Sequence, residues 1–174
     1  YVGHIIQVGE GIRADDKKVK KLLEMKRPEV VSEIKTFIGM AAYYRRFIKD
    51  FAHILYPLRK IENVFKSNEM PIGQLWGENQ QKSFNAVKAA LASAPILIFP
   101  DFTKPFIVTS DCSNWAMGSC IMQVKDGLER PIAYNSRALT KHEYKYGITD
   151  KEGAAATWAM RSNRQYLHGT QCIL

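Results

Sequence analysis

The spacing of the apolar residues changes near residue 93, and this change limits the folds open to the 174-residue chain. Before it, apolar side chains recur every three or four residues, as on one face of a helix. After it they alternate, or run in short stretches rich in β-branched residues, as in strands. The sequence therefore predicts a mainly helical first part, residues 1–90, and a second part built on a sheet, residues 93–174.

The clearest helical pattern follows Ser32, a residue type that often caps helices. Apolar side chains then recur at helical spacing over residues 34–51 and predict a single helix of about five turns. Arg45, Arg46 and Lys49 fall largely off this apolar stripe. The pattern alone is also that of an ordinary core helix with a solvated basic side.

Weaker signals complete the first part. Residues 1–6 read as a short strand, and residues 17–26 as a helix that Pro28 ends. Tyr56-Pro57-Leu58 opens a short further segment, residues 66–77 read as a loop, and a helix covers residues 78–93.

The second part reads as strands at residues 106–110, 117–123 and 131–134, a helix from Thr149 to about Tyr166, and the start of a fourth strand at residues 171–174. The links between the first three strands are short, which favours an antiparallel meander. The predicted fold class is therefore α+β, with an unfinished mixed sheet after the helices.

The net charge of +8 is uneven along the chain. Residues 1–60 hold 13 lysines and arginines against 7 acidic residues, whereas residues 61–174 hold 12 against 10. A basic excess in one third of the chain indicates a face for an acidic partner, nucleic acid first. The apolar runs are far shorter than the roughly 18 residues of a membrane span, and the N-terminus lacks a signal-peptide pattern.

The three cysteines, Cys112, Cys120 and Cys172, are an odd number without a C-x-x-C pair. A zinc site or a disulfide framework is therefore poorly supported, and a reducing compartment fits better. Their apolar surroundings predict buried thiols.

Two carboxylates stand out by their positions. Asp111 follows an uncharged strand, and Glu152 begins a helix. If that helix packs on the meander, the two come close, and divalent cations, Mg²⁺ or Mn²⁺ rather than zinc, would relieve their repulsion. Structural roles remain open: Asp111 can stabilise a turn, and Glu152 fits a capping box with Thr149.

The residues then resemble a known family. The segment Tyr1-Val2-Gly3-His4-Ile5-Ile6 is similar to the end of the palm in gypsy-type LTR-retrotransposon reverse transcriptases, where the primer terminus is held. Residues 33–51, above all Tyr43-Tyr44-Arg45-Arg46-Phe47-Ile48, resemble the thumb helix of that family, and residues 76–102 its connection into the RNase H domain.

The resemblance implies a fragment of a retrotransposon Pol polyprotein, an RNA-directed DNA polymerase and ribonuclease H. Ser110-Asp111-Cys112-Ser113 resembles the family's Thr-Asp-Ala-Ser, and residues 145–152 the segment with the second carboxylate. Asp111 and Glu152 would then hold part of a pair of Mg²⁺ or Mn²⁺ ions. The third carboxylate of the family is expected beyond Leu174, and the polymerase aspartates before Tyr1, so the chain alone is expected to be inactive.

The same resemblance implies partners. They are an RNA–DNA hybrid and the template–primer duplex, together with the rest of the polyprotein: palm and fingers upstream, and the remainder of RNase H and integrase downstream. No membrane is involved, and the expected location is a cytoplasmic virus-like particle or the nucleus, without secretion. The residues expected at nucleic acid are His4, Tyr43, Arg45, Arg46, Lys49, Ser113 and Asn114.

The chain also departs from the family pattern. Cys112 replaces the usual Ala, and Gly153-Ala154-Ala155-Ala156 stands where the family has a Leu-rich turn. A glycine early in a helix costs on the order of 0.5–1 kcal/mol. An alternative is therefore a degenerate or host-adopted copy acting as a non-catalytic nucleic-acid or protein-binding module. An unrelated basic α/β module would require these motif matches to be coincidence.

Overall fold

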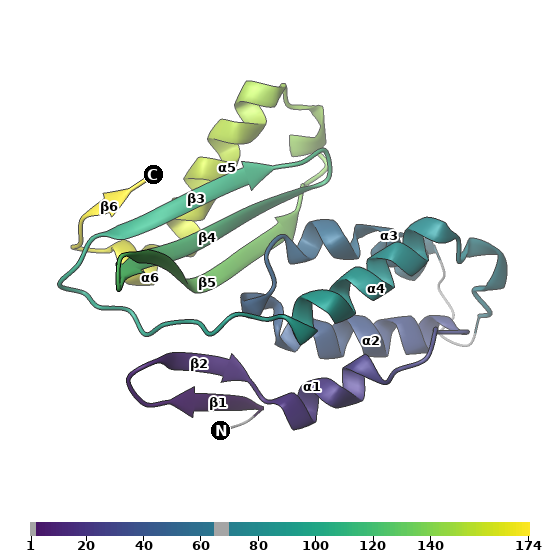
Figure 1. Ribbon diagram of the computed structural model, residues 1–174. Coiled ribbons are helices and arrows are strands. Elements are labelled where there is room, and N and C mark those ends of the chain that lie inside the picture. Colours follow the sequence, from purple (N-terminus) through teal and green to yellow (C-terminus); the bar gives the residue numbers. More distant parts are fainter. Residues whose placement is uncertain (1–2, 65–69) are drawn as a thin grey trace.

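The computed structural model describes residues 3–64 and 70–174, so part of the strand expected at residues 1–6 and part of the loop expected at residues 66–77 lie outside the described residues. A helical part, residues 3–92, lies beside a sheet part, residues 93–174 (Figure 1). The helices are α1 (Asp16–Leu23), α2 (Val31–Tyr43), α3 (Phe51–Val64), α4 (Glu78–Ala92), α5 (Ile148–Ser162) and α6 (Arg164–Leu167), with 3-10 turns η1 (Arg45–Phe47), η2 (Gly73–Leu75) and η3 (Glu143–Lys145). The strands are β1 (His4–Gln7), β2 (Gly11–Ala14), β3 (Phe106–Cys112), β4 (Ala116–Lys125), β5 (Leu128–Ala138) and β6 (Cys172–Ile173).

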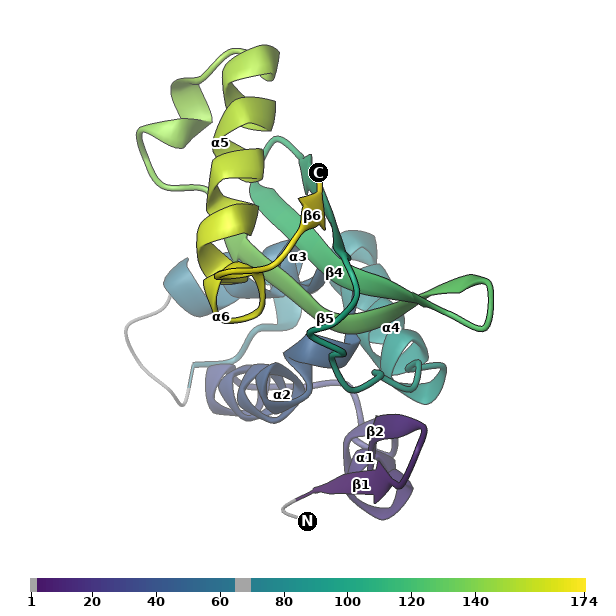
Figure 2. The same cartoon turned by 90° about the vertical axis from the view of Figure 1, so that its left-hand side faces the viewer.

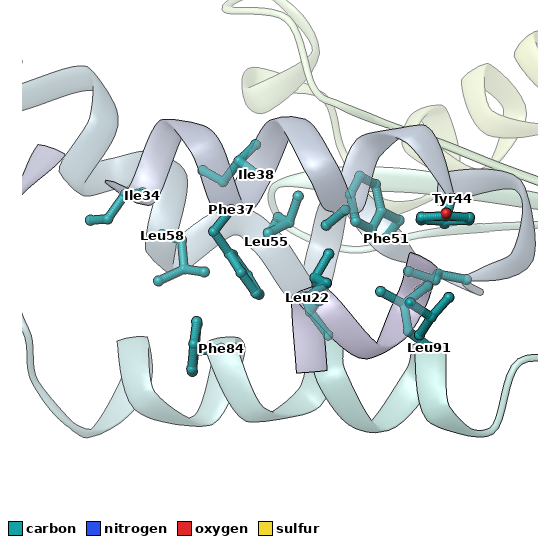
Figure 3. Packing of buried hydrophobic residues seen from close by; sticks show 14 of the residues in the cluster. Leu22, Ile34, Phe37, Ile38, Tyr44, Phe51, Leu55, Leu58, Phe84 and Leu91 are labelled. Carbon is teal, nitrogen blue, oxygen red and sulfur yellow. The ribbon is translucent and has the colours of Figure 1, made fainter. Parts of the chain in front are cut away.

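The helical part is built around one apolar core. Helices α1 to α4 each contribute an apolar stripe, and Phe37 of α2 packs on Phe84 of α4 with ring centroids 4.5 Å apart. Figure 3 shows these side chains converging between the helices. Burying a Leu or Phe side chain contributes roughly 1.5–3 kcal/mol, so this core holds the helices in place.

The single helix predicted over residues 32–51 is wrong. Helix α2 ends at Tyr43, η1 follows, and α3 begins at Phe51 in a new direction. Asp50, immediately before α3, has the left-handed backbone value φ 54°. The apolar residues across the break, Phe47 and Ile48, are still buried. Their burial explains why the apolar spacing continued through the turn.

The segment expected to open at Tyr56-Pro57-Leu58 is instead the middle of α3. Proline lacks the amide hydrogen that the helix would use at that position. The helix nevertheless continues, because Leu55, Leu58 and Ile61 on either side of Pro57 are almost completely buried in the core.

The sheet part has the strand order β5-β4-β3-β6. Strands β3, β4 and β5 form an antiparallel meander, and β6 pairs in parallel with the start of β3. Helix α5 covers one face of this sheet (Figure 2). The helix expected to reach Tyr166 breaks at buried Asn163, whose side-chain amide bonds to Ala159 and Asn135. The mixed α+β fold class is confirmed.

The other face of the sheet packs against the helical part. The amide of Ala52, at the start of α3, donates to Oγ of Ser136 on β5 at 2.9 Å. Ile12 of β2 and Leu97 exchange two backbone hydrogen bonds of 2.7 and 2.8 Å. Gly11 beside them lies so close to the Leu97 carbonyl that a Cβ would clash. The two parts therefore form one packed unit.

The thiols do not all follow the burial predicted for them. Cys120 is buried and Cys112 half-buried, but Cys172 is exposed, because short β6 lies at the edge of the sheet. All three are free. Within residues 3–64 and 70–174, none of the helices is both long and apolar enough to cross a bilayer.

Candidate functional site

Asp111 lies within β3, one residue before its end, and not after the strand as predicted. Side chains alternate between the faces of a strand. Phe106 and Val108 share an apolar cluster with Ala159 of α5, so Asp111 points to the opposite face, toward α3. Gly118, its direct partner on β4, has the Asp50 carboxylate over it, which places the same face against the helical part.

The Asp111 carboxylate is exposed, and Oδ1 accepts a hydrogen bond from the amide of Cys112 at 2.8 Å. It borders a small cavity of about 120 Å³ that Asp50 and His53 also line. Asp50 and His53 come from the helical part of the chain. They were missed in the sequence, although an Asp directly before apolar Phe51 is a helix-start signal that points to this turn.

Ser113 and Asn114 form the turn after β3. The hydroxyl of Ser113 bonds to both the amide and the carbonyl of Ala116, at 3.1 and 3.0 Å, and so closes the turn. Asn114 is exposed at its tip. Both residues follow Asp111 closely in the sequence, and Ser113 lines the small cavity that Asp111 borders.

Glu152 is exposed on the second turn of α5. The predicted capping box with Thr149 is wrong, because the N-cap lies two residues earlier, at Gly147, and the amide of Lys151 donates to the Gly147 carbonyl. Ala155, one turn further along, packs on the sheet, whereas Glu152 remains in solvent. The carboxylate is thus available for a partner other than the backbone.

Asp111 and Glu152 belong to opposite faces of the sheet. Among the described strands, β6 pairs with β3 at Phe106 and Ile107, near the start of that strand. Within residues 3–64 and 70–174, no group of three or more metal-ligating side chains is assembled.

The structure also brings together residues from the start and the middle of the helical part. His4 of β1 lies against Tyr43 at the end of α2, with Nδ1 and the Tyr43 hydroxyl 3.3 Å apart. Tyr44 and Phe47 complete this aromatic cluster around the imidazole. Burial, then the neighbouring hydroxyl of Tyr43 and the carboxylate of Asp15, raise the pKa of Tyr44, which keeps it neutral.

The basic residues that the sequence analysis expected at nucleic acid lie in two separate places. Arg45 and Arg46 lie on η1, next to the aromatic rings, with Arg45 exposed and Arg46 half-buried. Lys49 is exposed further along the turn and lines a cavity of about 340 Å³ with Asp50 and Asp111. Lys49 therefore adjoins the Asp111 face.

An antiparallel three-stranded meander, a helix across one face and a parallel strand beside the first strand define the first half of an RNase H-like sheet, with one carboxylate on its first strand and one on its helix. The family model of the RNase H-like domain found in reverse transcriptase matches residues 76–174. The chain belongs to this family, as the sequence resemblance indicated.

Relatives and solved structures agree with this assignment. The chain is 42% identical to the Pol polyprotein of the Drosophila melanogaster transposon opus over 99% of its length, and 36% identical to that of the transposon gypsy over 99%. It spans only 18% and 17% of those polyproteins. A foamy viral protease–reverse transcriptase bound to double-stranded DNA shares its fold, with a TM-score of 0.80 at 20% identity over 99% of this chain and 35% of the viral one.

Proposed function

We propose that this chain is a working segment of a retrotransposon reverse transcriptase and ribonuclease H. Its helical part acts as a thumb that grips the template–primer duplex or an RNA–DNA hybrid. Asp111 and Glu152 are two of the carboxylates that hold Mg²⁺ for cleavage of the RNA strand. The observation that carries the proposal is an exposed carboxylate on the first strand of an RNase H-like sheet, in a chain of this family.

The grip is supported by the cluster at the end of α2. His4 and Tyr43 are held against each other, so β1 and α2 present one surface. Arg45 on η1 extends that surface with an exposed guanidinium, which binds phosphate without reading sequence. The related foamy viral enzyme has been solved with an RNA/DNA hybrid, a ligand that suits the same role here.

The first test is duplex binding. Replacing Arg45 and Arg46 by Ala removes two charges, so we expect weaker binding of an RNA–DNA hybrid. The slope of log affinity against log salt should fall by up to about 1.8, or roughly 0.9 for each lost phosphate contact. Fluorescence anisotropy at several salt concentrations measures both the affinity for the hybrid and its salt slope. Arg161→Ala/Arg164→Ala, which removes the same charge from exposed sites on α5 and α6, is the matched control; equal losses in the two variants would refute the grip.

The residues fit a divalent ion in donor type. Carboxylate oxygens are the ligands that Mg²⁺ prefers, and both carboxylates are exposed to solvent. When bound, a pair of such ions activates a water and stabilises the leaving oxygen of the phosphodiester. Asp111 and Glu152 would hold the ions, and Ser113 and Asn114 in the adjoining turn would contact the sugar and phosphate of the RNA strand.

The second test is Mg²⁺ binding to the chain itself. Because the described residues form no group of three or more ligands, we expect weak binding and little hybrid cleavage by these 174 residues alone. Mg²⁺ titration followed by NMR should shift the amide signals around Asp111 and Glu152, and Asp111→Asn should abolish that shift. Asp126→Asn is the control, since Asp126 is an exposed turn residue whose left-handed backbone an Asn accepts.

Two results would count against this assignment. An unchanged Mg²⁺ response in Asp111→Asn would remove Asp111 from the metal site and favour a non-catalytic binding module. Rapid, Asp111-dependent cleavage of hybrid by the chain alone would instead show that the two carboxylates suffice.

A further inference from the structure

A groove of about 630 Å³ runs between α3 and α4 and ends at Trp115 in the β3–β4 turn. The surface at the end of α2 that we propose binds a duplex does not include this groove. His53 lines both this groove and the small cavity at Asp111, so the two hollows adjoin. Its volume lies in the range of roughly 300–1,000 Å³ that is typical of ligand sites.

The charges around the groove suit an anion. Lys60 from α3 and Lys82 from α4 line it, and none of the described residues lining it is acidic. Lys82 forms an ion pair of 2.7 Å with Glu78, but both side chains are more than two-thirds exposed. Such a pair is weak in water, so Lys82 remains available to a phosphate.

Aromatic rings lie at the sheet end of the groove. Tyr56 and Trp115 are stacked, with ring centroids 5.2 Å apart and planes 10° from parallel. Lys60 Nζ lies 4.9 Å from the Tyr56 centroid, and both residues line the groove. Burial and the neighbouring Tyr56 hydroxyl raise the pKa of Tyr144, so this third phenol lies beside Tyr56. The rings are therefore fixed before any ligand arrives, which lowers the entropy cost of binding.

Lysines beside an aromatic ring are a combination that binds single-stranded nucleic acid, since phosphates meet the cations and a base can stack on a ring such as Trp115, which lines the groove. We infer that the groove between α3 and α4 binds a single strand of nucleic acid that leads toward or away from Asp111. The inference rests on the proposed function, because the strand would continue from nucleic acid held at the Asp111 face. The chemistry is sequence-independent, so the partner is any single strand.

The test uses the full chain and two probes: a short oligothymidylate, and a blunt RNA–DNA hybrid of the same length. Lys60→Ala/Lys82→Ala should weaken oligothymidylate binding roughly tenfold at low salt and reduce its salt slope by about 1.4, at roughly 0.7 per contact. Hybrid binding should change less than about twofold. Arg45→Ala/Arg46→Ala should show the reverse preference.

Lys18→Ala/Lys21→Ala, two exposed lysines of α1, controls for net charge alone. In NMR spectra, oligothymidylate should shift the Trp115 indole signal but not that of Trp158, which belongs to α5 and packs beside Met117 and Leu139.

The possible outcomes bear on the groove and on the duplex-binding proposal in different ways. Equal losses in the groove and α1 variants would show only a general charge effect and would overturn the inference. Hybrid binding without oligothymidylate binding would overturn the inference that the groove binds a single strand. The proposal that the helical part binds a duplex would remain. A chain that binds neither probe would overturn both.

Discussion

At the scale of single residues, a bidentate ion pair holds the entry to α5. The two terminal guanidinium nitrogens of Arg137, near the end of β5, donate to the carboxylate of Glu143 in η3, at 2.7 and 2.8 Å. The amide of Thr140 donates to the same carboxylate at 2.7 Å. These bonds fix the turn that leads to the helix bearing Glu152.

The hydrogen bond from Arg137, more than any other contact, lowers the pKa of Glu143 from 4.5 to about 2. A group whose pKa is lower in the folded state stabilises the fold above its unfolded pKa and loses that effect as the pH falls through its folded value. Glu143→Gln should therefore lower the free energy of unfolding by about 1–2 kcal/mol at pH 7. The difference from the wild type should shrink between about pH 5 and pH 2.

Urea unfolding followed by circular dichroism at pH 7 and pH 3 measures this effect. Glu78→Gln is the matched control, because its ion pair with Lys82 is exposed and worth less than about 0.5 kcal/mol. A loss in Glu143→Gln that is the same at both pH values would contradict the role given to the ion pair.

At the scale of elements, the apolar spacing predicted which segments are regular but not where they turn. The spacing from Ile34 continues through Phe47 to Phe51, yet the chain changes direction between α2 and α3. Periodicity reports burial, and these residues are buried on both sides of the break. The prediction of a capping box at Thr149 was also wrong. Glycine suits an N-cap as well, so the motif alone could not decide between Gly147 and Thr149.

Packing of the elements also decided the surroundings of the candidate site. The sequence indicated Asp111 and Glu152 as separate carboxylates on a strand and a helix, and it could place neither on a face of the sheet. The alternation of Phe106 and Val108 toward α5 leaves Asp111 on the other face, where Asp50 and His53 come from a distant segment. Such long-range neighbours leave no trace in local spacing.

At the scale of the whole molecule, the two parts meet where Asp50 lies over Gly118. A Cβ on Gly118 would come within 2.5 Å of Oδ1 of Asp50, so the carboxylate would have to move to make room for it. Gly118→Ala should cost about 1–3 kcal/mol of stability by overpacking. Asp50→Gly should recover much of that loss in the double variant, because it removes the carboxylate and suits the left-handed backbone at that position.

A double-mutant cycle by thermal or urea unfolding measures the coupling between the two positions. Gly153→Ala on α5 is the control: nothing lies within 4 Å of its Cβ position, so the added methyl should stabilise by about 0.5–1 kcal/mol. Additive effects of Gly118→Ala and Asp50→Gly would mean that the two parts are not held together at this point.

The sequence by itself determined the family, the change from helices to strands near residue 93, and the residue types that can bind metal and phosphate, because local propensity, apolar spacing and the motifs are written along the chain. Tertiary structure decided the break after α2, the face on which Asp111 lies, the joining of His4 to Tyr43, and the groove that ends at Trp115. Each of these depends on contacts between segments far apart in sequence. The packing of the whole core decides which segments meet, and the apolar spacing within one segment carries no information about its distant partners.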